Sequence, residues 1–418
     1  MQKELKPPAS PARPPIVVQK YGGSSVADVA KLGKVADRIV ATRRAGNDVV
    51  VVVSAMGKAT DDLLRLAGEV STAGRADAEP PRRELDMLVS TGERVAMALL
   101  SIAIQARGLQ AISFTGSQCG IITNDRHFDA RIIEVRPHRI EDELARGCVV
   151  IVAGYQGMSY KREITTLGRG GSDTTAVALA AALDAKQCEI YSDVDGVYSA
   201  DPRVVPDAAH LPELGYDSVQ EMAESGAKVL CAQAVEWARR AGIALYARST
   251  FDRIEAAPRQ TLIRKFGPSS QPRARAVVAD RDVVLGTASL DEPAERIDEV
   301  LQLLTDAGVR LRQVHHQEAA ISLVLSVTNA PQWAGARRDA ERLVPSLGFQ
   351  DAVALVSVTG SGLTDDARSV ARFRRLLTEI GARPRLLDAS ALRLSAVIDE
   401  AALQSAQQRL HDELVADR

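Results

Sequence analysis

The chain has 418 residues, which is long enough for two or three domains. Its 52 lysines and arginines nearly balance 54 aspartates and glutamates, and the formal charge of -2 argues against a basic nucleic-acid-binding surface and a polyacidic tail. We therefore expect a small-molecule partner and no nucleic acid. No CxxC pair occurs among the four cysteines, which argues against a zinc site or a disulfide framework and favours the reduced cytoplasm.

Residues 1–15 are expected to form a flexible leader, because they contain five prolines and lack the apolar run of a signal peptide. No uninterrupted apolar run reaches the ~18 to 20 residues that span a bilayer, so no membrane partner is expected. From residue 16 to about 265, short apolar runs alternate with segments of helical period. Continuously apolar strands between helices predict an α/β sandwich around a mostly parallel sheet, with ligands at the carboxyl ends of its strands.

The first polar motif is QKYGGSSV, residues 19–26, which follows an apolar run and precedes a segment of helical period. Gly22 and Gly23 would let the backbone approach a ligand, and the next helix would present unpaired amides to an anion. Lys20 adds a positive charge, and the hydroxyls of Ser24 and Ser25 can donate hydrogen bonds. The motif predicts a phosphate site, with a glycine-rich turn that binds nothing as the alternative.

Two further motifs follow, SAMGKATDD and STGERVAMALL. Ser54 comes directly after a strand of five valines, and Thr60 and Asp61 are expected to open and cap the next helix. Glu93 is expected at the start of an apolar helix, where a carboxylate is favoured by the helix dipole. An ordinary first-turn glutamate is the alternative interpretation of Glu93.

The fourth motif is GRGGSDTTA, where Arg169, Gly170, Gly171, Ser172 and Asp173 lead into an alanine-rich helix. An arginine and two glycines at a helix N-terminus favour anionic groups, and the aspartate could orient a lysine or magnesium. A simple helix cap is the alternative for the aspartate.

Downstream, SDVDGVYSADPR carries three aspartates, at 193, 195 and 201, which we interpret as turn residues because no calcium-loop glutamate follows at the required distance. Lys228 follows a glycine in SGAKVL. Lysines, glycines, hydroxyls and aspartates together describe a site for a phosphate-rich ligand. Phosphoryl transfer requires that kind of site, because its catalysis depends on positioning and charge neutralisation.

A segment rich in proline, glycine and serine, residues 266–276, is expected to link the first region to a second one. Residues 277–418 show the order strand, helix, strand, strand, helix twice, which predicts two α+β units of similar size. No catalytic cluster occurs in this repeat, so we expect it to serve interaction or regulation.

The six motifs occur in the order and spacing of the aspartate kinases, and the chain resembles that family over residues 16–416. The resemblance implies the amino-acid kinase fold for residues 16–265, followed by two ferredoxin-like ACT domains. It also implies transfer of the γ-phosphate of ATP to the side-chain carboxylate of L-aspartate, giving 4-phospho-L-aspartate. The product would supply lysine, threonine and methionine synthesis or a specialised aspartate-derived product.

The resemblance also implies roles for individual residues. Lys20 would neutralise the transferring phosphoryl group, and Asp173 would organise the catalytic site. Arg169 would bind a carboxylate of aspartate, and Glu93 would bind its ammonium group. Magnesium would be held by phosphate oxygens, with no protein metal site. The residues implied around aspartate are Ser54, Thr60, Glu93, Arg169, Gly170, Gly171 and Ser172. The residues implied around ATP are Lys20, Gly22, Gly23, Ser24, Ser192, Asp193, Tyr198, Arg203 and Lys228.

The sequence departs from the family pattern at several positions. Tyr21 and Ser24 replace phenylalanine and threonine, and Cys231 with Ala232 replaces histidine and proline at the edge of the nucleotide site. In the repeat, LDEPAE at 290–295 and HHQEAAISL at 315–323 replace segments that hold a feedback amino acid in the family. We therefore expect inhibition by lysine and threonine to be weakened, absent or redirected to another effector.

A homo-oligomer is expected, most simply a dimer that pairs through the repeats. The last methionine is Met222, so a separate regulatory chain cannot start at a methionine within the repeat. Two alternatives to an aspartate kinase stay open: a related kinase that acts on another acid, and a non-catalytic amino-acid sensor.

Overall fold

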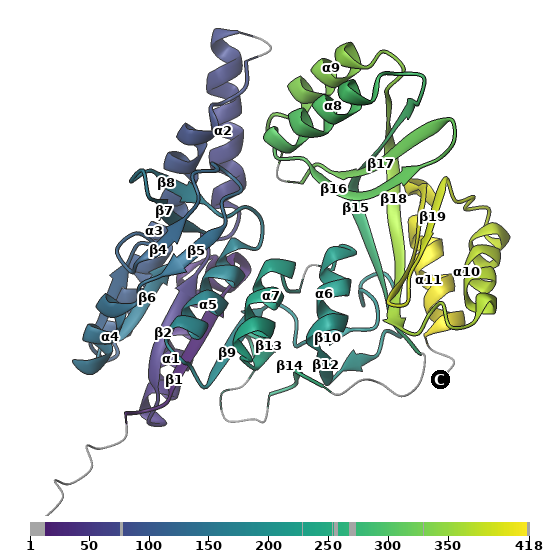
Figure 1. Ribbon diagram of the computed structural model, residues 1–418. Helices are drawn as coiled ribbons and strands as arrows, with labels where there is room; N and C mark the ends of the chain where they lie inside the picture. Colours follow the sequence, from purple (N-terminus) through teal and green to yellow (C-terminus); the bar gives the residue numbers. More distant parts are fainter. Residues whose placement is uncertain are drawn as a thin grey trace, which may run out of the picture.

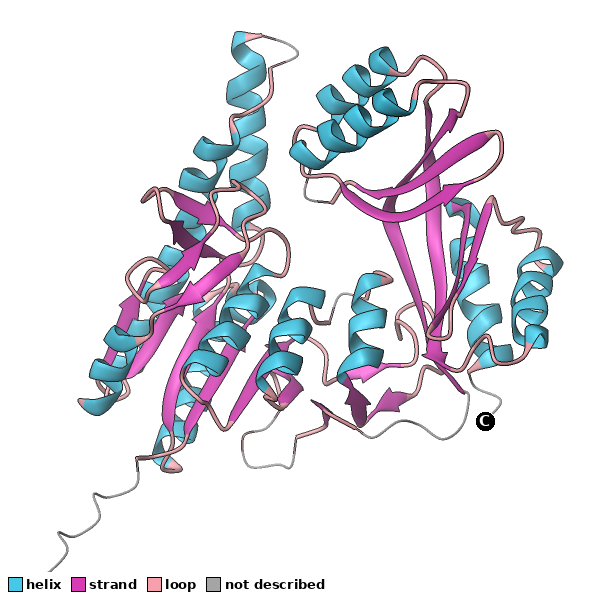
Figure 2. Cartoon of the chain, in the orientation of Figure 1, coloured by secondary structure: helices cyan, strands magenta, loops and turns pink. Residues whose placement is uncertain are grey.

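The computed structural model describes residues 13–75, 78–227, 229–252, 254, 258–266, 273–328 and 330–415. The described chain forms an N-terminal part, built on a large sheet, and a C-terminal part, built on a second sheet (Figure 1). In Figure 2 helices lie against both faces of the first sheet, whereas the long strands of the second sheet stand beside two pairs of helices.

The large sheet has eight strands, and all its neighbouring pairs are parallel except β13 and β14. This confirms the predicted α/β architecture. In spatial order the strands are β12 (Glu213–Gly215), β14 (Gln260–Arg264), β13 (Leu245–Ser249), β9 (Gln187–Ser192), β1 (Ile16–Tyr21), β2 (Asp48–Val53), β6 (Val149–Ala153) and β3 (Ala111–Phe114).

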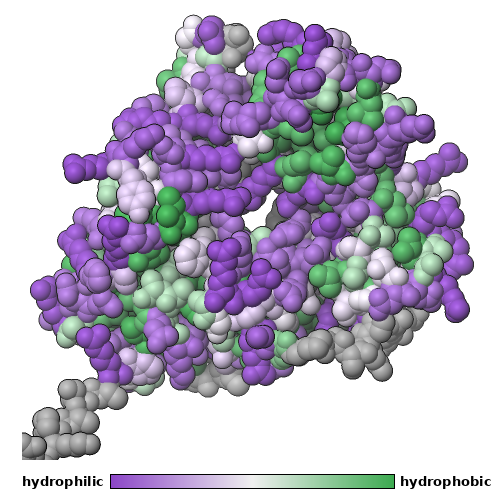
Figure 3. Space-filling model, viewed as in Figure 1, coloured by the Kyte–Doolittle hydropathy of each residue, from purple (hydrophilic) through white to green (hydrophobic). Residues whose placement is uncertain are grey.

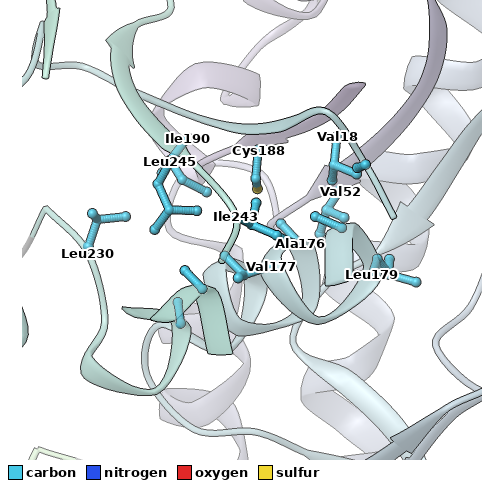
Figure 4. Packing of buried hydrophobic residues seen from close by; sticks show 14 of the residues in the cluster. Val18, Val52, Ala176, Val177, Leu179, Cys188, Ile190, Leu230, Ile243 and Leu245 are labelled. Atoms are coloured by element: carbon cyan, nitrogen blue, oxygen red, sulfur yellow. The ribbon is translucent and has the colours of Figure 1, made fainter. Parts of the chain in front are cut away.

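Both faces of the central strands are buried, as their continuous apolar sequence predicts. Since side chains alternate along a strand, Val49, Val51 and Val53 of β2 pack in the core beneath α1 (Val29–Arg44) and α3 (Arg82–Gln105), whereas Val50 and Val52 pack against α5 (Gly171–Ala182). Figure 4 shows this second core, in which Val18 and Val52 meet Leu179 and Cys188. The helices of the N-terminal part are α1 (Val29–Arg44), α2 (Ala59–Gly74), α3 (Arg82–Gln105), α4 (His138–Ala145), α5 (Gly171–Ala182), α6 (Tyr216–Glu224) and α7 (Ala232–Ala241).

Two small sheets and a short 3-10 turn complete the N-terminal part. The turn η1 covers Gly23–Val26 and lies between β1 and α1. The four-stranded sheet contains β5 (Ile132–Val135), β4 (Ile121–Thr123), β7 (Gln156–Ser159) and β8 (Ile164–Thr166), and the two-stranded sheet contains β10 (Val197–Tyr198) and β11 (His210–Leu211).

Helix α3 is the one helix in the described part of the chain whose 24 residues are long and apolar enough to cross a membrane. Its position in the fold explains that composition. Val89, Ala96, Leu100 and Ile104 are buried at helical spacing, and the last three pack in the core beneath the sheet. The helix is therefore a core element of the N-terminal part.

The C-terminal part contains one antiparallel sheet of six strands. Its strands, in spatial order, are β16 (Arg310–His316), β17 (Ala320–Ser326), β15 (Arg273–Ser289), β18 (Gly348–Ser361), β20 (Arg393–Asp399) and β19 (Leu386–Ala389). Its helical elements are α8 (Ala294–Asp306), α9 (Trp333–Leu343), α10 (Ala367–Glu379), the 3-10 turn η2 (Glu400–Ala402) and α11 (Leu403–Leu414).

The two α+β halves of this sheet share their central strands. Residues 283–289 of β15 pair with β17, whereas residues 273–280 pair with the end of β18, which in turn pairs with β20. Strand β15 begins at Arg273, within the segment expected to be a linker, and is much longer than the predicted strand. The second half of the repeat therefore takes one strand from before the first half, and the two units are not consecutive in space.

The core of the second half also receives residues from the N-terminal part. Ala200 and Val205 pack with Phe373 and Leu410 in one apolar cluster. The backbone amide of Val277 in β15 donates to the carbonyl of Ser199 at 2.7 Å. The segment after β10 is thus part of the packing of both halves of the molecule.

Truncation of Leu179 should destabilise the protein by about 2 to 5 kcal/mol, because this fully buried side chain of α5 fills the core shown in Figure 4 and its loss leaves a cavity. Urea unfolding of Leu179→Ala, followed by circular dichroism, measures the change. Leu66→Ala on α2 is the matched control, since Leu66 is 49% exposed and should change the unfolding free energy by less than about 0.5 kcal/mol. Equal effects of the two substitutions would contradict this description of the core.

Candidate active site

The carboxyl ends of β1, β2 and β9 meet at one edge of the large sheet, where β1 lies between the other two strands. A cavity of about 600 Å³ opens there, and Figure 3 shows the molecule hollowed between its two parts. Every residue expected around aspartate lines this cavity. The cavity-lining residues among the predicted site residues are Lys20, Gly22, Gly23, Ser54, Thr60, Glu93, Arg169, Gly170, Gly171, Ser172 and Asp173.

The charged centre of the cavity is an ion pair between Lys20 and Asp173. The ammonium of Lys20, the penultimate residue of β1, lies 2.7 Å from the carboxylate of Asp173, and the two side chains are only 12% and 9% exposed. Asp173 is the third residue of α5, and the N-cap position is taken by Gly170 in the left-handed conformation (φ 78°). The cap interpretation of Asp173 is therefore wrong, and its carboxylate faces the lysine.

The glycines of the first motif permit a close approach of two loops. A Cβ atom on Gly23 would lie 2.7 Å from the carbonyl oxygen of Ala55, and one on Gly92 would lie 2.8 Å from the Cβ of Ala55. Only glycine fits these contacts without a shift of the backbone. The loop after β2 is thus held between the first motif and helix α3, which places Ser54 and Gly57 in the cavity wall.

The helix expected directly after the first motif begins later than predicted. Residues 23–26 form the turn η1, and α1 starts at Val29, where Asp28 accepts a hydrogen bond from the amide of Lys31 at 2.8 Å. The N-terminus of α1 is thus already capped and does not line the cavity. Ser24 is exposed outside the cavity, and the Ser25 hydroxyl is buried against that of Thr250 at 2.6 Å, so the expectation that Ser25 binds phosphate is wrong.

Glu93 lies in the middle of α3 rather than at the start of a helix. The segment before it continues the helix because Leu85 and Val89 extend the apolar face. The side chain of Glu93 is 3% exposed, and its Oε1 atom accepts a hydrogen bond from the amide of Ala55 at 3.1 Å. Among the described residues, no hydrogen-bond donor reaches Oε2. Burial raises the pKa of this carboxyl to about 7.

The turn before α5 brings the other polar groups of the fourth motif to the cavity. Arg169 is exposed there, and Ser172 is 7% exposed in the first turn of the helix. A Cβ atom on Gly170 would meet the Cβ of Cys231 at 2.3 Å, which places Cys231 directly against this turn. The thiol of Cys231 lies 3.2 Å from the hydroxyl of Thr174.

Thr60 and Asp61 line the cavity from the first turn of α2, whose N-cap is Lys58, so neither is the predicted cap. Of the residues expected around the nucleotide, Lys20, Gly22 and Gly23 line this cavity, whereas Ser192, Asp193, Tyr198 and Arg203 do not and lie at and after the end of β9. Tyr198 donates to Asp195 at 2.7 Å, and Arg203 forms an ion pair with Asp201. Ser192 and Asp193 also belong to this segment, and Lys228 lies outside the described residues.

Sequence reasoning missed two aromatic residues of the cavity wall. Phe128 and Tyr155 line the cavity, and both adopt left-handed backbone conformations with φ of 67°. Such a conformation is unusual for a residue other than glycine and is favoured at sites that the surrounding structure holds in place. Tyr155 stands in the glycine-bearing segment GYQGM and Phe128 stands among charged residues, but neither segment indicates that an aromatic side chain would line the site.

The C-terminal sheet supplies one wall of the same cavity. The sequence had predicted that this repeat serves interaction or regulation, without a contribution to the site. Arg310 of β16 forms an ion pair with Asp129 at 2.6 Å, and Arg312 forms one with Asp280 at 3.1 Å. The cavity-lining residues of the C-terminal part are Asp280, Asp282, Arg310, Arg312, Ser326 and Thr328. Among the residues that the structure describes, no group of three or more His, Cys, Asp and Glu side chains could hold a metal ion.

Comparison with known proteins assigns the family. A model of the amino acid kinase family matches residues 15–249. The chain is 42% identical over 417 residues to an aspartokinase of Mycolicibacterium smegmatis, covering 95% of each chain. It is 37% identical over 404 residues to an aspartokinase of Geobacillus stearothermophilus, covering 95% of this chain and 96% of that one.

Solved structures agree with the sequence relatives. The fold matches Escherichia coli aspartokinase III in complex with aspartate and ADP (R-state) with a TM-score of 0.81 at 27% identity, covering 96% of this chain and 99% of that one. The same enzyme in complex with lysine and aspartate (T-state) gives a TM-score of 0.68 over the same coverage. With its Lys20–Asp173 centre at the edge of a parallel sheet and its relatives over nearly the whole length, the chain belongs to the aspartokinase family.

Proposed function

We propose that this aspartokinase transfers the γ-phosphoryl group of ATP to the side-chain carboxylate of L-aspartate, with Lys20 and Asp173 at the catalytic centre. The observation that carries the proposal is the Lys20–Asp173 ion pair in the sheet-edge cavity. The acceptor carboxylate is already ionised at neutral pH, so no general base is needed. The barrier comes from repulsion between two anions, and a lysine between them lowers it.

Aspartate would be oriented by groups at opposite ends of its backbone. The buried Oε2 atom of Glu93 is suited to an ammonium group, because a buried carboxylate oxygen without a hydrogen-bond partner gains both a hydrogen bond and a charge partner. Arg169 would bind a carboxylate, supported by the amides at the start of α5. Ser54, Thr60 and Ser172 would complete the polar lining of this half of the cavity.

ATP would enter from the side of β9. Gly22 and Gly23 admit the phosphates close to the backbone, because neither has a side chain and Gly22 lies beside Lys20. Ser192, Asp193, Tyr198 and Arg203 are the proposed contacts to the rest of the nucleotide, together with Ser24 and Lys228. Mg²⁺ would bind mainly through phosphate oxygens, and its chemistry is to neutralise phosphate charge.

The two alternatives are less favoured. A kinase that phosphorylates another acid is expected to be most similar to proteins named for that activity. The relatives found here, at 37 to 42% identity, are called aspartokinases. A non-catalytic sensor has no physical need for an ion pair and an unpaired buried carboxylate in one cavity. Phosphorylation of aspartate therefore explains the site with the fewest unexplained charges.

We also propose that this enzyme works in the cytoplasm as a homo-oligomer, most simply a dimer that pairs through the C-terminal sheet. All four cysteines are free in the described structure, as in a reducing compartment. Leu311 and Val314 of the edge strand β16 are each 46% exposed, and apolar residues gather over the C-terminal part in Figure 3. An edge strand with exposed apolar side chains is suited to pairing with a second copy.

Altered feedback is the third part of the proposal. The two segments that depart from the family pattern adjoin, since the amide of Leu290 donates to the carbonyl of Ala319 at 3.1 Å and Ala320 pairs with Ser289. Ala319 and Ala320 have no polar side-chain atom with which to hold an effector amine. Escherichia coli aspartokinase III has been solved with lysine in its T-state, and this chain matches the R-state more closely.

Replacing Lys20 by methionine should lower kcat by about 100- to 1000-fold, because the cation that neutralises the transferring phosphoryl group is lost. The rate is measured as ATP-dependent hydroxamate formation with L-aspartate, in which hydroxylamine traps the acyl phosphate. Lys186→Met is the control, since Lys186 is an exposed lysine away from the cavity. Absence of hydroxamate from the unaltered enzyme would reject aspartate as the substrate.

The Glu93 carboxyl should control the pH dependence of aspartate capture. Its pKa of about 7 means that it loses its charge as the pH falls below 7, and an ammonium group binds the charged form. With MgATP saturating, kcat/KM for aspartate should fall by about tenfold per pH unit below 7. Glu93→Gln should lower kcat/KM by about 30-fold or more at pH 8 and remove this slope. A slope that survives in the variant would assign the titration to another group.

Lysine and threonine, singly or together at millimolar concentration, should slow the enzyme by less than about fivefold, which is the effect of a weak allosteric coupling. The reason is the loss of a polar effector contact at Ala319 and Ala320. Steady-state rates with and without each amino acid measure the effect. Stronger inhibition of Ala320→Asp by lysine or threonine would identify the missing carboxylate as the cause. Strong inhibition of the unaltered enzyme by either amino acid would refute altered feedback.

A further inference from the structure

A second buried carboxylate lies on α3 next to the site and has no role in the proposed mechanism. Asp86 precedes Glu93 by two helical turns, so the two side chains are on the same side of the helix. Asp86 has no exposed surface, and it does not line the cavity. Burial raises the pKa of its carboxyl, and hydrogen bonds from Thr166, His127 and the amide of Phe128 oppose that rise.

The partners of Asp86 come from two segments that are far apart in the sequence. Its Oδ1 atom accepts hydrogen bonds from the Phe128 amide at 3.1 Å and from the Thr166 hydroxyl at 2.5 Å. Its Oδ2 atom lies 2.6 Å from Nδ1 of His127. One carboxylate therefore joins the loop after β4 to the end of β8.

Each of these segments continues into the wall of the active-site cavity. Phe128 lines the cavity itself, in its left-handed conformation. Thr166 is followed by Leu167, whose amide donates to the carbonyl of Tyr155 at 2.9 Å, and then by the turn that contains Arg169. The amide of Ala130 donates to the carbonyl of Thr166 at 2.8 Å, so the two segments are also joined directly.

A left-handed conformation of a residue other than glycine is unfavourable and persists only where neighbouring groups hold it. The Asp86 carboxylate provides such a hold, because it accepts from the Phe128 amide itself. A side-chain hydrogen bond also links Tyr155 to Thr166. Both aromatic walls of the cavity thus depend, directly or through one residue, on Asp86.

We propose that Asp86 is a positioning residue for aspartate, which acts through Phe128 and Thr166 to fix the cavity wall and the Arg169 turn. The inference rests on the proposed function of the cavity and names a residue that does not itself touch substrate. Loss of the carboxylate should let the two segments move apart, and aspartate should then be held less well. The nucleotide segment after β9 shares none of these hydrogen bonds, so the affinity for ATP should be nearly unchanged.

The test measures KM for aspartate and KM for ATP separately in Asp86→Ala. KM for aspartate should rise by about 10- to 100-fold, whereas KM for ATP should change by less than about twofold. Asp86→Asn keeps an oxygen that can accept from the Phe128 amide, and it should recover part of the loss. Thr166→Val removes one hydrogen bond at similar volume and keeps the test valid if Asp86→Ala does not fold.

The matched control is Asp48→Asn, because Asp48 is also buried, at 8% exposure, but begins β2 at the opposite end of the strand from the cavity. Hydrogen exchange provides a readout that needs no substrate: peptides covering residues 124–131 and 164–171 should lose protection in Asp86→Ala and keep it in Asp48→Asn. Unchanged protection, or equal changes in the two KM values, would overturn the inference. Failure of the proposed function would be seen first in the unaltered enzyme, as a lack of hydroxamate from aspartate.

Discussion

The ion pair between Lys20 and Asp173 depends on the parallel order of the strands in the large sheet. Strand β2 is apolar after its first residue, whereas β1 and β9 each carry one buried polar side chain in mid-strand, Gln19 and Glu189, which hydrogen-bond to each other at 2.8 Å. Because neighbouring strands are parallel, their carboxyl ends meet at one edge, and α5 begins at the same edge. The charges of the site are close together because β1 ends and α5 begins at this edge.

Much of this arrangement could be predicted from the sequence. The alternation of valine-rich strands with helical segments indicated the parallel sheet, and the glycine-bearing segments after the strands indicated where the site lies. Lys20, Glu93 and Asp173 were all identified as candidate residues and all line one cavity. Local patterns sufficed for these features because buried strands and sheet-edge loops differ strongly in composition.

The features that could not be predicted depend on tertiary contacts. Glu93 lies in mid-helix because the apolar face of the helix continues back through Leu85 and Val89. Charged residues between these positions in the sequence made that pattern hard to recognise. The left-handed conformations of Phe128 and Tyr155 have no sequence signal, since neighbouring groups impose them. The C-terminal wall of the cavity was missed because Arg310 reaches Asp129 across 181 residues of chain.

The continuity of β15 and β18 has a consequence for how this enzyme could be taken apart or have evolved. Each strand runs through both halves of the C-terminal sheet, so neither half can be excised, exchanged or duplicated as a module without cutting a shared strand. The two α+β units follow each other in the sequence, but they share strands in the structure and cannot be separated. An insertion between the halves would have to preserve the register of both strands, which confines tolerated length changes to the helices and their loops.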